Sequence, residues 1–188
     1  MSVEKMNEKP IVNIVRTEIV TEEDVPKTYR FNTATEATYS PVVSEGAETV
    51  LRVKEEIKAV NRTEDIQYGS DINFSQAVMS PEVLAIVDGG TLTTTGSEGQ
   101  EKVTKYTPPV VGAPVVRKKF TLKVYTEEKD ADGETLGYQC FAYKGCKGRP
   151  VNYTFKDGEF MVPQYTVKSR VKKGVAPYEL DFLEELPV

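Results

Sequence analysis

Histidine is absent from this sequence of 188 residues, and its absence limits the chemistry that the chain can perform. Without imidazole, no Ser-His-Asp or Cys-His nucleophilic system, histidine general base or histidine zinc site can form. An enzyme based on carboxylate, lysine or tyrosine groups remains open. The acidic residues, however, fall mostly in turns, and none has the apolar setting that would raise its pKa for acid–base work. We therefore expect no catalytic residue, no cofactor and no metal ion.

Two cysteines and one acidic run are the remaining candidates for chemistry. Cys140 and Cys146 are separated by five residues. They could form a disulfide or half of a metal site, but two thiolates without histidine make a poor zinc site, so reduced thiols beside a hairpin are the favoured interpretation. Residues 130–134 (DADGE) contain the carboxylates of a calcium loop but not its twelve-residue spacing, and they indicate a hairpin turn.

The charges are balanced along the chain. Basic residues cluster at 117–119, 144–149 and 168–173, and acidic runs such as 22–24 offset them, giving a net charge of −5. Balanced patches of this kind are typical of solvated faces or of salt-bridged subunit edges. A protein that reads DNA would normally carry net positive charge, so specific nucleic-acid binding is not expected.

The composition predicts one domain with parts that the monomer does not bury. The apolar fraction is 39% and the mean hydropathy is −0.41, which is lean for a compact globule. Residues 1–9 are polar and charged, so we expect no signal peptide. No apolar run approaches the length needed to span a bilayer. We expect the protein to be made and kept in the cytoplasm until something larger releases it.

Valine, isoleucine, threonine and tyrosine recur with alternating apolar residues, which favours β-structure. The predicted strands cover residues 11–20, 29–33, 35–43, two strands around a charged turn within 48–60, and then 66–77, 117–125, 137–143, 151–155 and 160–171. The strands at 117–125 and 137–143 form a long hairpin, and a bulge or sheet edge is expected at Pro163.

One segment is predicted to be a helix, because residues that typically start and stop helices flank it. Ser80 is the expected N-cap and Pro81 the first helical residue, while Gly89 and Gly90 end the helix. The next segment, residues 91–114, is rich in Thr, Gly, Ser and Pro and is predicted to be a long loop. Such length suggests a functional or intersubunit role, although a surface excursion without function explains it equally well.

These elements predict a mainly β fold, a β-sandwich or barrel of seven to nine strands with one short helix at residues 80–88. Residues 1–188 form a single domain, with an N-terminal arm at 1–10 and an acidic tail at 178–188 that carries enough apolar surface to dock somewhere.

Two stretches carry a resemblance to a known family. Residues 79–91 (MSPEVLAIVDGGT), which follow the strand that includes 71–74, resemble the single helix and glycine stop of the tail tube (major tail) proteins of long-tailed bacteriophages and phage-derived particles, especially those of Gram-positive hosts. Residues 151–163 (VNYTFKDGEFMVP), together with the strand that continues to Arg170, are similar to that family's C-terminal pair of strands. The resemblance extends over roughly residues 32–171, and the arm and the tail lie outside it.

The resemblance implies a structural protein whose six subunits close into a ring. The rings stack into a tail tube around a tape measure protein, and DNA leaves through an acidic lumen without specific binding. Sheath, baseplate and terminator proteins are the further partners that it implies. Assembly would take place in the host cytoplasm, and the product would be located in the virion tail.

Apolar residues in the loop and the tail are the expected inter-subunit contacts, because assembly would bury them. They are Tyr106, Pro108, Val110, Val111, Leu180, Phe182, Leu183 and Leu186. Three alternatives remain: another virion component such as a tail terminator or baseplate hub, an Ig-like adhesion or binding domain, and an enzyme without histidine.

Overall fold

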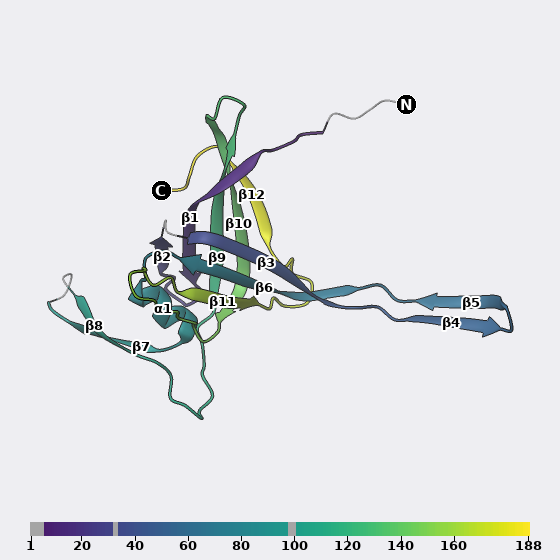
Figure 1. Cartoon of the computed structure of the whole chain (residues 1–188), viewed down its shortest axis with the longest axis horizontal. Coiled ribbons are helices and arrows are strands. Elements are labelled where there is room, and N and C mark those ends of the chain that lie inside the picture. Colours follow the sequence, from purple (N-terminus) through teal and green to yellow (C-terminus); the bar gives the residue numbers. More distant parts are fainter. Residues whose placement is uncertain (1–5, 32–33, 98–100) are drawn as a thin grey trace.

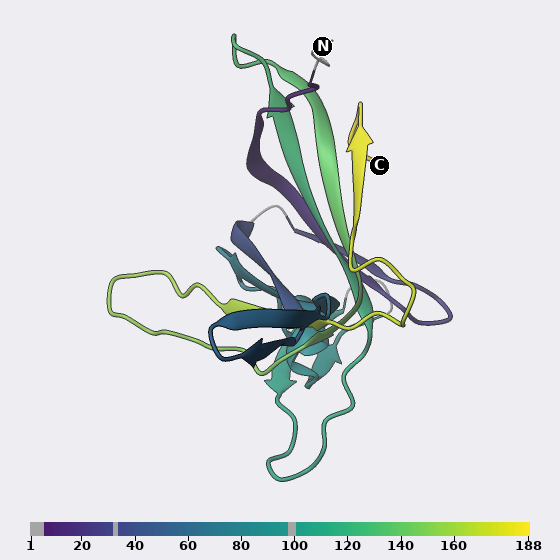
Figure 2. The ribbon, with the colours of Figure 1, turned by 90° about the vertical axis from the view of Figure 1, so that its right-hand side faces the viewer.

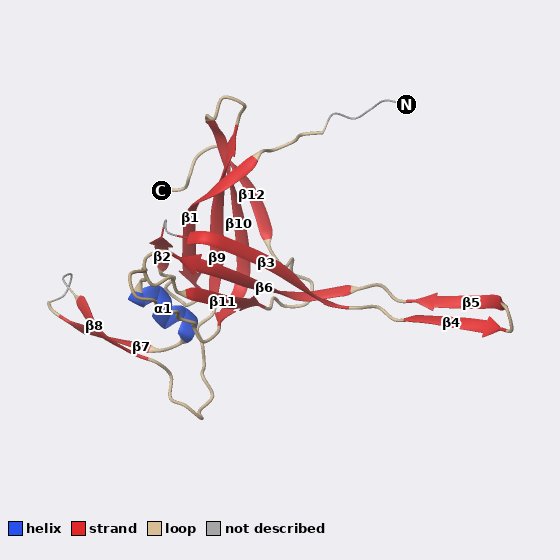
Figure 3. Cartoon of the chain, in the orientation of Figure 1, coloured by secondary structure: helices blue, strands red, loops and turns tan. Residues whose placement is uncertain are grey.

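The computed structural model describes residues 6–31, 34–97 and 101–188, and in them the chain is mainly β with one short helix, as predicted (Figures 1 and 3). The elements in chain order are β1 (Ile11–Thr21), β2 (Thr28–Phe31), β3 (Ala34–Ser44), β4 (Glu48–Val53), β5 (Glu56–Arg62), β6 (Ile66–Gln76), α1 (Pro81–Asp88), β7 (Thr91–Thr95), β8 (Lys102–Thr107), β9 (Phe120–Lys129), β10 (Thr135–Gly148), β11 (Gln164–Ser169) and β12 (Glu179–Leu183).

Eight strands form one antiparallel sheet in the order β2-β1-β9-β10-β11-β6-β3, with β12 added to β10. The sheet has two halves, and β10 belongs to both. Its first part pairs with β9, and after a register shift between Tyr143 and Cys146 its last residues pair with β11. In Figure 1 the strands β3, β6 and β11 run across β1, β9 and β10, so the two halves enclose a core between them.

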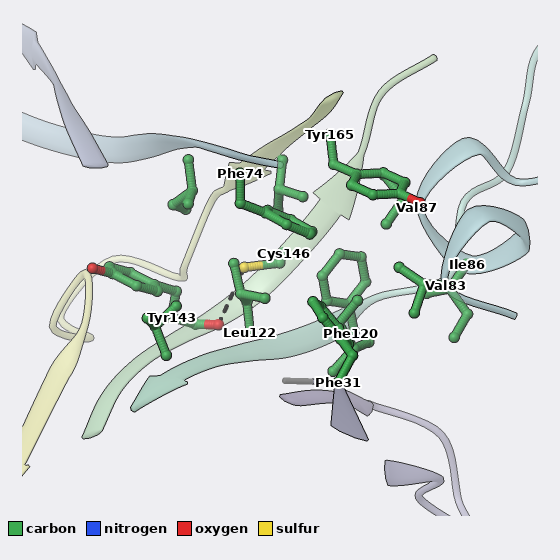
Figure 4. Close-up of a cluster of buried hydrophobic side chains, with 14 of the residues drawn as sticks. Phe31, Phe74, Val83, Ile86, Val87, Phe120, Leu122, Tyr143, Cys146 and Tyr165 are labelled. Atoms are coloured by element: carbon green, nitrogen blue, oxygen red, sulfur yellow. Dashed lines mark hydrogen bonds between the residues drawn. The ribbon is translucent and has the colours of Figure 1, made fainter. Parts of the chain in front are cut away.

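The core lies where the halves face each other and where α1 closes one end (Figure 4). Phe120, Leu122 and Val124 alternate along β9 on its inner face. From the other half, Phe74 stacks on Tyr165 with ring centroids 5.0 Å apart. These side chains are almost completely excluded from solvent, and burying each contributes about 1.5–3 kcal/mol.

Helix α1 has the predicted bounds and a different N-terminal contact. Ser80 occupies the N-cap position, but its side chain does not cap the helix. Instead the Ser80 hydroxyl accepts a hydrogen bond from the Gln76 amide at 3.0 Å, because Gln76 is buried and needs a partner. Gly89 ends the helix in the left-handed conformation at φ 87°, and its N–H donates to the Ala85 carbonyl.

Gly148 determines how closely α1 approaches the sheet. A Cβ at Gly148 would lie 1.9 Å from the Val87 carbonyl oxygen and 2.5 Å from the Val87 Cα. Only glycine therefore allows the last turn of α1 to rest on the end of β10. This contact holds Val83, Leu84 and Val87 against the core.

The prediction of a long loop at residues 91–114 is wrong for the first part of this segment. Strands β7 and β8 form a hairpin there, with Leu92 opposite Tyr106. The threonines that suggested a loop are β-branched and favour strands when a partner strand is available. The residues after Thr107 are without regular structure as far as Lys119, so strand β9 begins at Phe120 rather than at the predicted residue 117.

The C-terminal third also differs from the prediction. The segment 151–155 is not a strand, because a single bridge between Asn152 and Gln164 is all that connects it to the sheet. The strand predicted at 160–171 is shortened to β11 (Gln164–Ser169), and Pro163 precedes it. The stretch that resembled a pair of strands in tail tube proteins is therefore a loop followed by one strand. The acidic tail contributes a further strand, β12, which makes the total twelve among the described residues.

We predict that Gly148→Ala destabilises the monomer by about 2–3 kcal/mol, because the new Cβ meets helix backbone that cannot move without displacing core residues. Urea unfolding followed by circular dichroism measures this loss. Ala131→Gly, in the exposed turn after β9, is the control and should change stability little. An unchanged midpoint for Gly148→Ala would show that α1 does not rest on β10.

Candidate assembly surfaces

A long β-arm projects from the main sheet. Strands β4 and β5 continue the β3–β6 pair outwards (Figure 1), and every residue from Glu48 to Arg62 is exposed. The two strands predicted within 48–60 are present, and the turn between them, predicted at residues 54–56, is formed by Lys54 and Glu55 while Glu56 begins β5. An isolated two-stranded hairpin is marginally stable in water, so an arm without a packed face calls for an additional contact.

Both faces of the arm carry apolar side chains. Val50 is opposite Val60, and Leu51, which is opposite Ala59, points to the other face. Leu51 is 59% exposed and Ile57 61% exposed. In a hairpin that only has to be soluble, at least one face would be uniformly polar.

The whole chain exposes 13,573 Å² of accessible surface. A compact monomer of this mass would expose about 9,000 Å². One partner contributes about 1,000–2,500 Å² to an obligate interface, so the excess of about 4,500 Å² leaves room for contacts with more than one neighbour. The lean apolar composition therefore corresponds to segments that project from the core.

The loop after β8 is the first predicted contact region. Val110 and Val111 are 77% and 98% exposed, and Pro108 is exposed as well. Figure 2 shows this loop projecting below the sheet. Tyr106 differs from them, because it is partly buried and its hydroxyl donates a hydrogen bond to the Asp88 carboxylate. Tyr106 thus joins the β7–β8 hairpin to α1 within the monomer.

A second loop, residues 150–163, was missed as a candidate surface because it was assigned to strands. Tyr153 stacks on Phe155 with ring centroids 6.3 Å apart, while Phe155 is 79% exposed and Phe160 is 96% exposed. Figure 2 shows the loop extending away from the sheet. The density of aromatic residues on both sides of the Asp157-Gly158 turn was the available signal.

The four predicted tail contacts, three in β12 and Leu186 after it, have two different environments. Leu180 and Phe182 face outwards and are 36% and 58% exposed. Leu183 and Leu186 are partly buried against a small cluster that contains Tyr125. The tail therefore docks on its own chain, and deleting residues 178–188 would remove monomer contacts together with any assembly contact.

A buried carboxylate fastens the end of this tail. Glu18 is 4% exposed and forms ion pairs with Arg16 at 3.2 Å and Arg30 at 2.9 Å. Arg16 also donates to the Pro187 carbonyl at 2.7 Å, and Arg30 donates to the Val188 carbonyl. Because an unpaired buried carboxylate is costly, these arginines are held in place and hold the tail with them.

Burial raises the pKa of cysteine and tyrosine side chains in this chain further above neutral pH. It raises the pKa of the Cys140 thiol and raises that of Cys146 to about 12, so both free cysteines are protonated and weakly nucleophilic. Burial likewise raises the pKa of Tyr143 to about 12. Hydrogen bonds from Asn13 and Thr135 lower the pKa of Glu127. In the described ranges no group of three or more potential metal ligands is found.

The described part of the chain contains no helix with the length and apolarity needed to cross a bilayer.

Comparisons with known proteins do not identify a family. No family model matches the sequence, and no curated protein matches it. Among solved structures, one similar chain belongs to the six-fold symmetrised cryo-EM structure of the anti-feeding prophage (AFP) baseplate. It is 9% identical with a TM-score of 0.40, and the alignment covers 97% of each chain. A likeness at this level carries no conclusion about what the present chain does.

We predict that the monomer loses stability as the pH rises from about 9 towards about 12. The pKa of Cys146 is raised from its ordinary value of 9.0 to about 12. Below about pH 9 both states keep the proton, and above it the unfolded thiol ionises first, so unfolding becomes easier. The expected cost is about 1.4 kcal/mol at about pH 10.

Urea unfolding of the wild type and of Cys146→Ala at about pH 8 and about pH 10 isolates this contribution. The alanine variant is less stable at both pH values. The difference in the free energy of unfolding between the two proteins should be smaller at the higher pH. A difference that is the same at both pH values would contradict the buried, protonated thiol.

Proposed function

We propose that this chain is a structural subunit of a phage tail or phage tail-like particle, and that copies of it assemble into hexameric rings stacked as a tail tube. The excess of exposed surface carries this proposal, since about 4,500 Å² beyond that of a compact monomer is available for contacts between copies. The ring, its six-fold number, the tape measure protein and the passage of DNA rest on the resemblance to tail tube proteins.

The β-arm supports assembly into a larger particle. Its two apolar faces have no cover within the described residues, whereas the core of the same molecule is well packed. A neighbouring copy that covered one face would bury Leu51 and Val53 or Val50 and Val60. Head-to-tail contacts of this kind close into a ring when the rotation between copies permits it.

Free strand edges give a second route to contacts between copies. Strands β2 and β3 end the main sheet, and β12 is paired on one side only. Exposed edges are normally avoided because they recruit other strands. In a subunit of a permanent assembly the same edges are joints, as β3 would be over its eleven residues.

The distribution of surface also separates this proposal from an adhesion domain. An Ig-like domain that acts as a monomer keeps its apolar side chains between two sheets. Here Val111, Val116 and Phe160 are each more than nine-tenths exposed, on loops that lie outside the sheet. A terminator or baseplate component would share these contacts and would form rings without long tubes.

Negative-stain electron microscopy of the purified protein over a concentration series tests the proposal. We expect rings, and at higher concentration hollow tubes of uniform width. Rings that never extend would favour the terminator or baseplate assignment. A monomer at every concentration, even when the other proteins of the particle are added, would overturn the proposed function.

We predict that the double substitution Leu51→Ser and Val53→Ser prevents assembly and leaves the monomer folded. Both side chains are exposed in the monomer, so the free energy of unfolding should change by no more than about 0.5 kcal/mol. Burial of one such side chain at an interface contributes about 1.5–3 kcal/mol, so the concentration needed for assembly should rise more than about tenfold.

The matched control is Val25→Ser, which removes a valine that is 75% exposed in the turn between β1 and β2, away from the arm. Sedimentation of assembled material and circular dichroism are measured for each variant. Assembly of the arm variant at the wild-type concentration would show that the arm is not an interface.

A further inference from the structure

A basic groove lies at the open end of the β9–β10 hairpin. It has a volume of about 490 Å³, and six cationic side chains from three segments line it: Arg117, Lys119, Lys147, Arg149, Lys168 and Arg170. The three basic clusters of the sequence, far apart along the chain, meet here. The tertiary structure thus brings basic residues from different parts of the sequence together and creates a local excess of positive charge.

Few carboxylates neutralise this groove. Asp71 pairs with Arg170 at 2.9 Å and with Lys168 at 3.6 Å. Glu22 lies beside it and accepts a hydrogen bond from the Gly145 N–H. In the described ranges, no carboxylate is within salt-bridge distance of the other four cations, Arg117, Lys119, Lys147 and Arg149.

The opposite end of the same hairpin is acidic. Asp132 and Glu134 are exposed in the turn, where Asp130 accepts the N–H groups of both residues and shapes the turn. Glu184 and Glu185 follow Leu183, which pairs with Tyr138 near this end of β10. None of these five carboxylates forms an ion pair within the described part of the chain.

The two charged ends cannot neutralise each other within one molecule. Figures 1 and 2 show the turn of the β9–β10 hairpin at the top and its open end near α1 at the bottom. From Thr135 to Lys147 the strand covers roughly 40 Å. This separation is several times the Debye length of about 8 Å at physiological salt. The acidic turn and the basic groove can therefore meet only between molecules.

We propose that the acidic turn of one copy, residues 130–134, docks in the basic groove of the next copy and sets the head-to-tail direction of stacking. This inference rests on the proposed function, because it assigns the contact between successive rings. The contact joins two different surfaces, so each added copy presents a new acidic turn and a new groove. Such a heterologous contact continues as a filament when the rotation between copies does not close a ring.

Two charge-reversed variants test the contact. The groove variant carries Lys119→Glu and Lys147→Glu, and the turn variant carries Asp132→Lys and Glu134→Lys. All four side chains are exposed, and Asp130 is kept because it shapes the turn. Lys102→Glu with Lys105→Glu, on exposed positions of β8, is the control with the same change of net charge as the groove variant.

Sedimentation velocity and electron microscopy should show that each variant alone stacks more than about tenfold more weakly than the wild type. An equimolar mixture of the two variants should stack more strongly than either variant alone. The unchanged turn of the groove variant meets the unchanged groove of the turn variant, and the lysines introduced into the turn meet the glutamates introduced into the groove. The control should behave as the wild type. Stacking of the wild type should weaken as NaCl is raised. Failure of the mixture to stack, or normal stacking of either variant alone, would overturn the proposal.

Three further outcomes are distinguishable. If labelled double-stranded DNA binds the wild type and not the groove variant, while stacking is equal in both, the groove is a polyanion site and the stacking contact is wrong. If the mixture restores linear association but no ring or tube ever forms, the contact stands and the proposed tube is wrong. If rings form from both variants but stack only in the mixture, both proposals hold.

Discussion

The two halves of the sheet are held together because a single strand, β10, pairs in both. Its first part is joined to β9 and β12, and beyond the register shift at Tyr143 and Cys146 it is joined to β11. This change of partner turns one half across the other and creates the space that Leu122, Cys146 and Phe74 fill. The end of β10 also carries Gly148, on which α1 rests, so the closure of the core depends on the same strand.

Around this compact centre the chain distributes apolar side chains in a way that a monomer does not explain. The apolar side chains of β9, β11 and α1 pack in the core. Those of the β-arm and of the loops at 108–119 and 150–163 are exposed to solvent. Exposing many large apolar side chains to water is unfavourable in isolation. The proposed assembly with other copies would remove this cost, so we expect substitutions to separate the stability of the monomer from the formation of the particle.

Charged residues also differ between the interior of the monomer and the ends of the β9–β10 hairpin. Within the monomer, buried Glu18 is matched by Arg16 and Arg30, and this match fastens the C-terminal tail. At the ends of the β9–β10 hairpin the charges are left unmatched, acidic at the turn and basic at the groove. Long-range charge of this kind adds direction and specificity to association more than it adds affinity.

The sequence by itself determined the mainly β class, the helix at residues 80–88 and most strands, because alternation, caps and glycine stops act over a few residues. The contacts with other subunits that it predicted for Val110, Val111 and the tail remain predictions. Only the tertiary structure decided that 91–107 pairs as a hairpin, that 151–155 does not, and that Leu183 packs on its own chain. Strand pairing depends on a partner distant in sequence, and local propensity cannot specify which partner is available. The basic groove was hidden for the same reason, since its three clusters meet only after β10 has brought the two halves together.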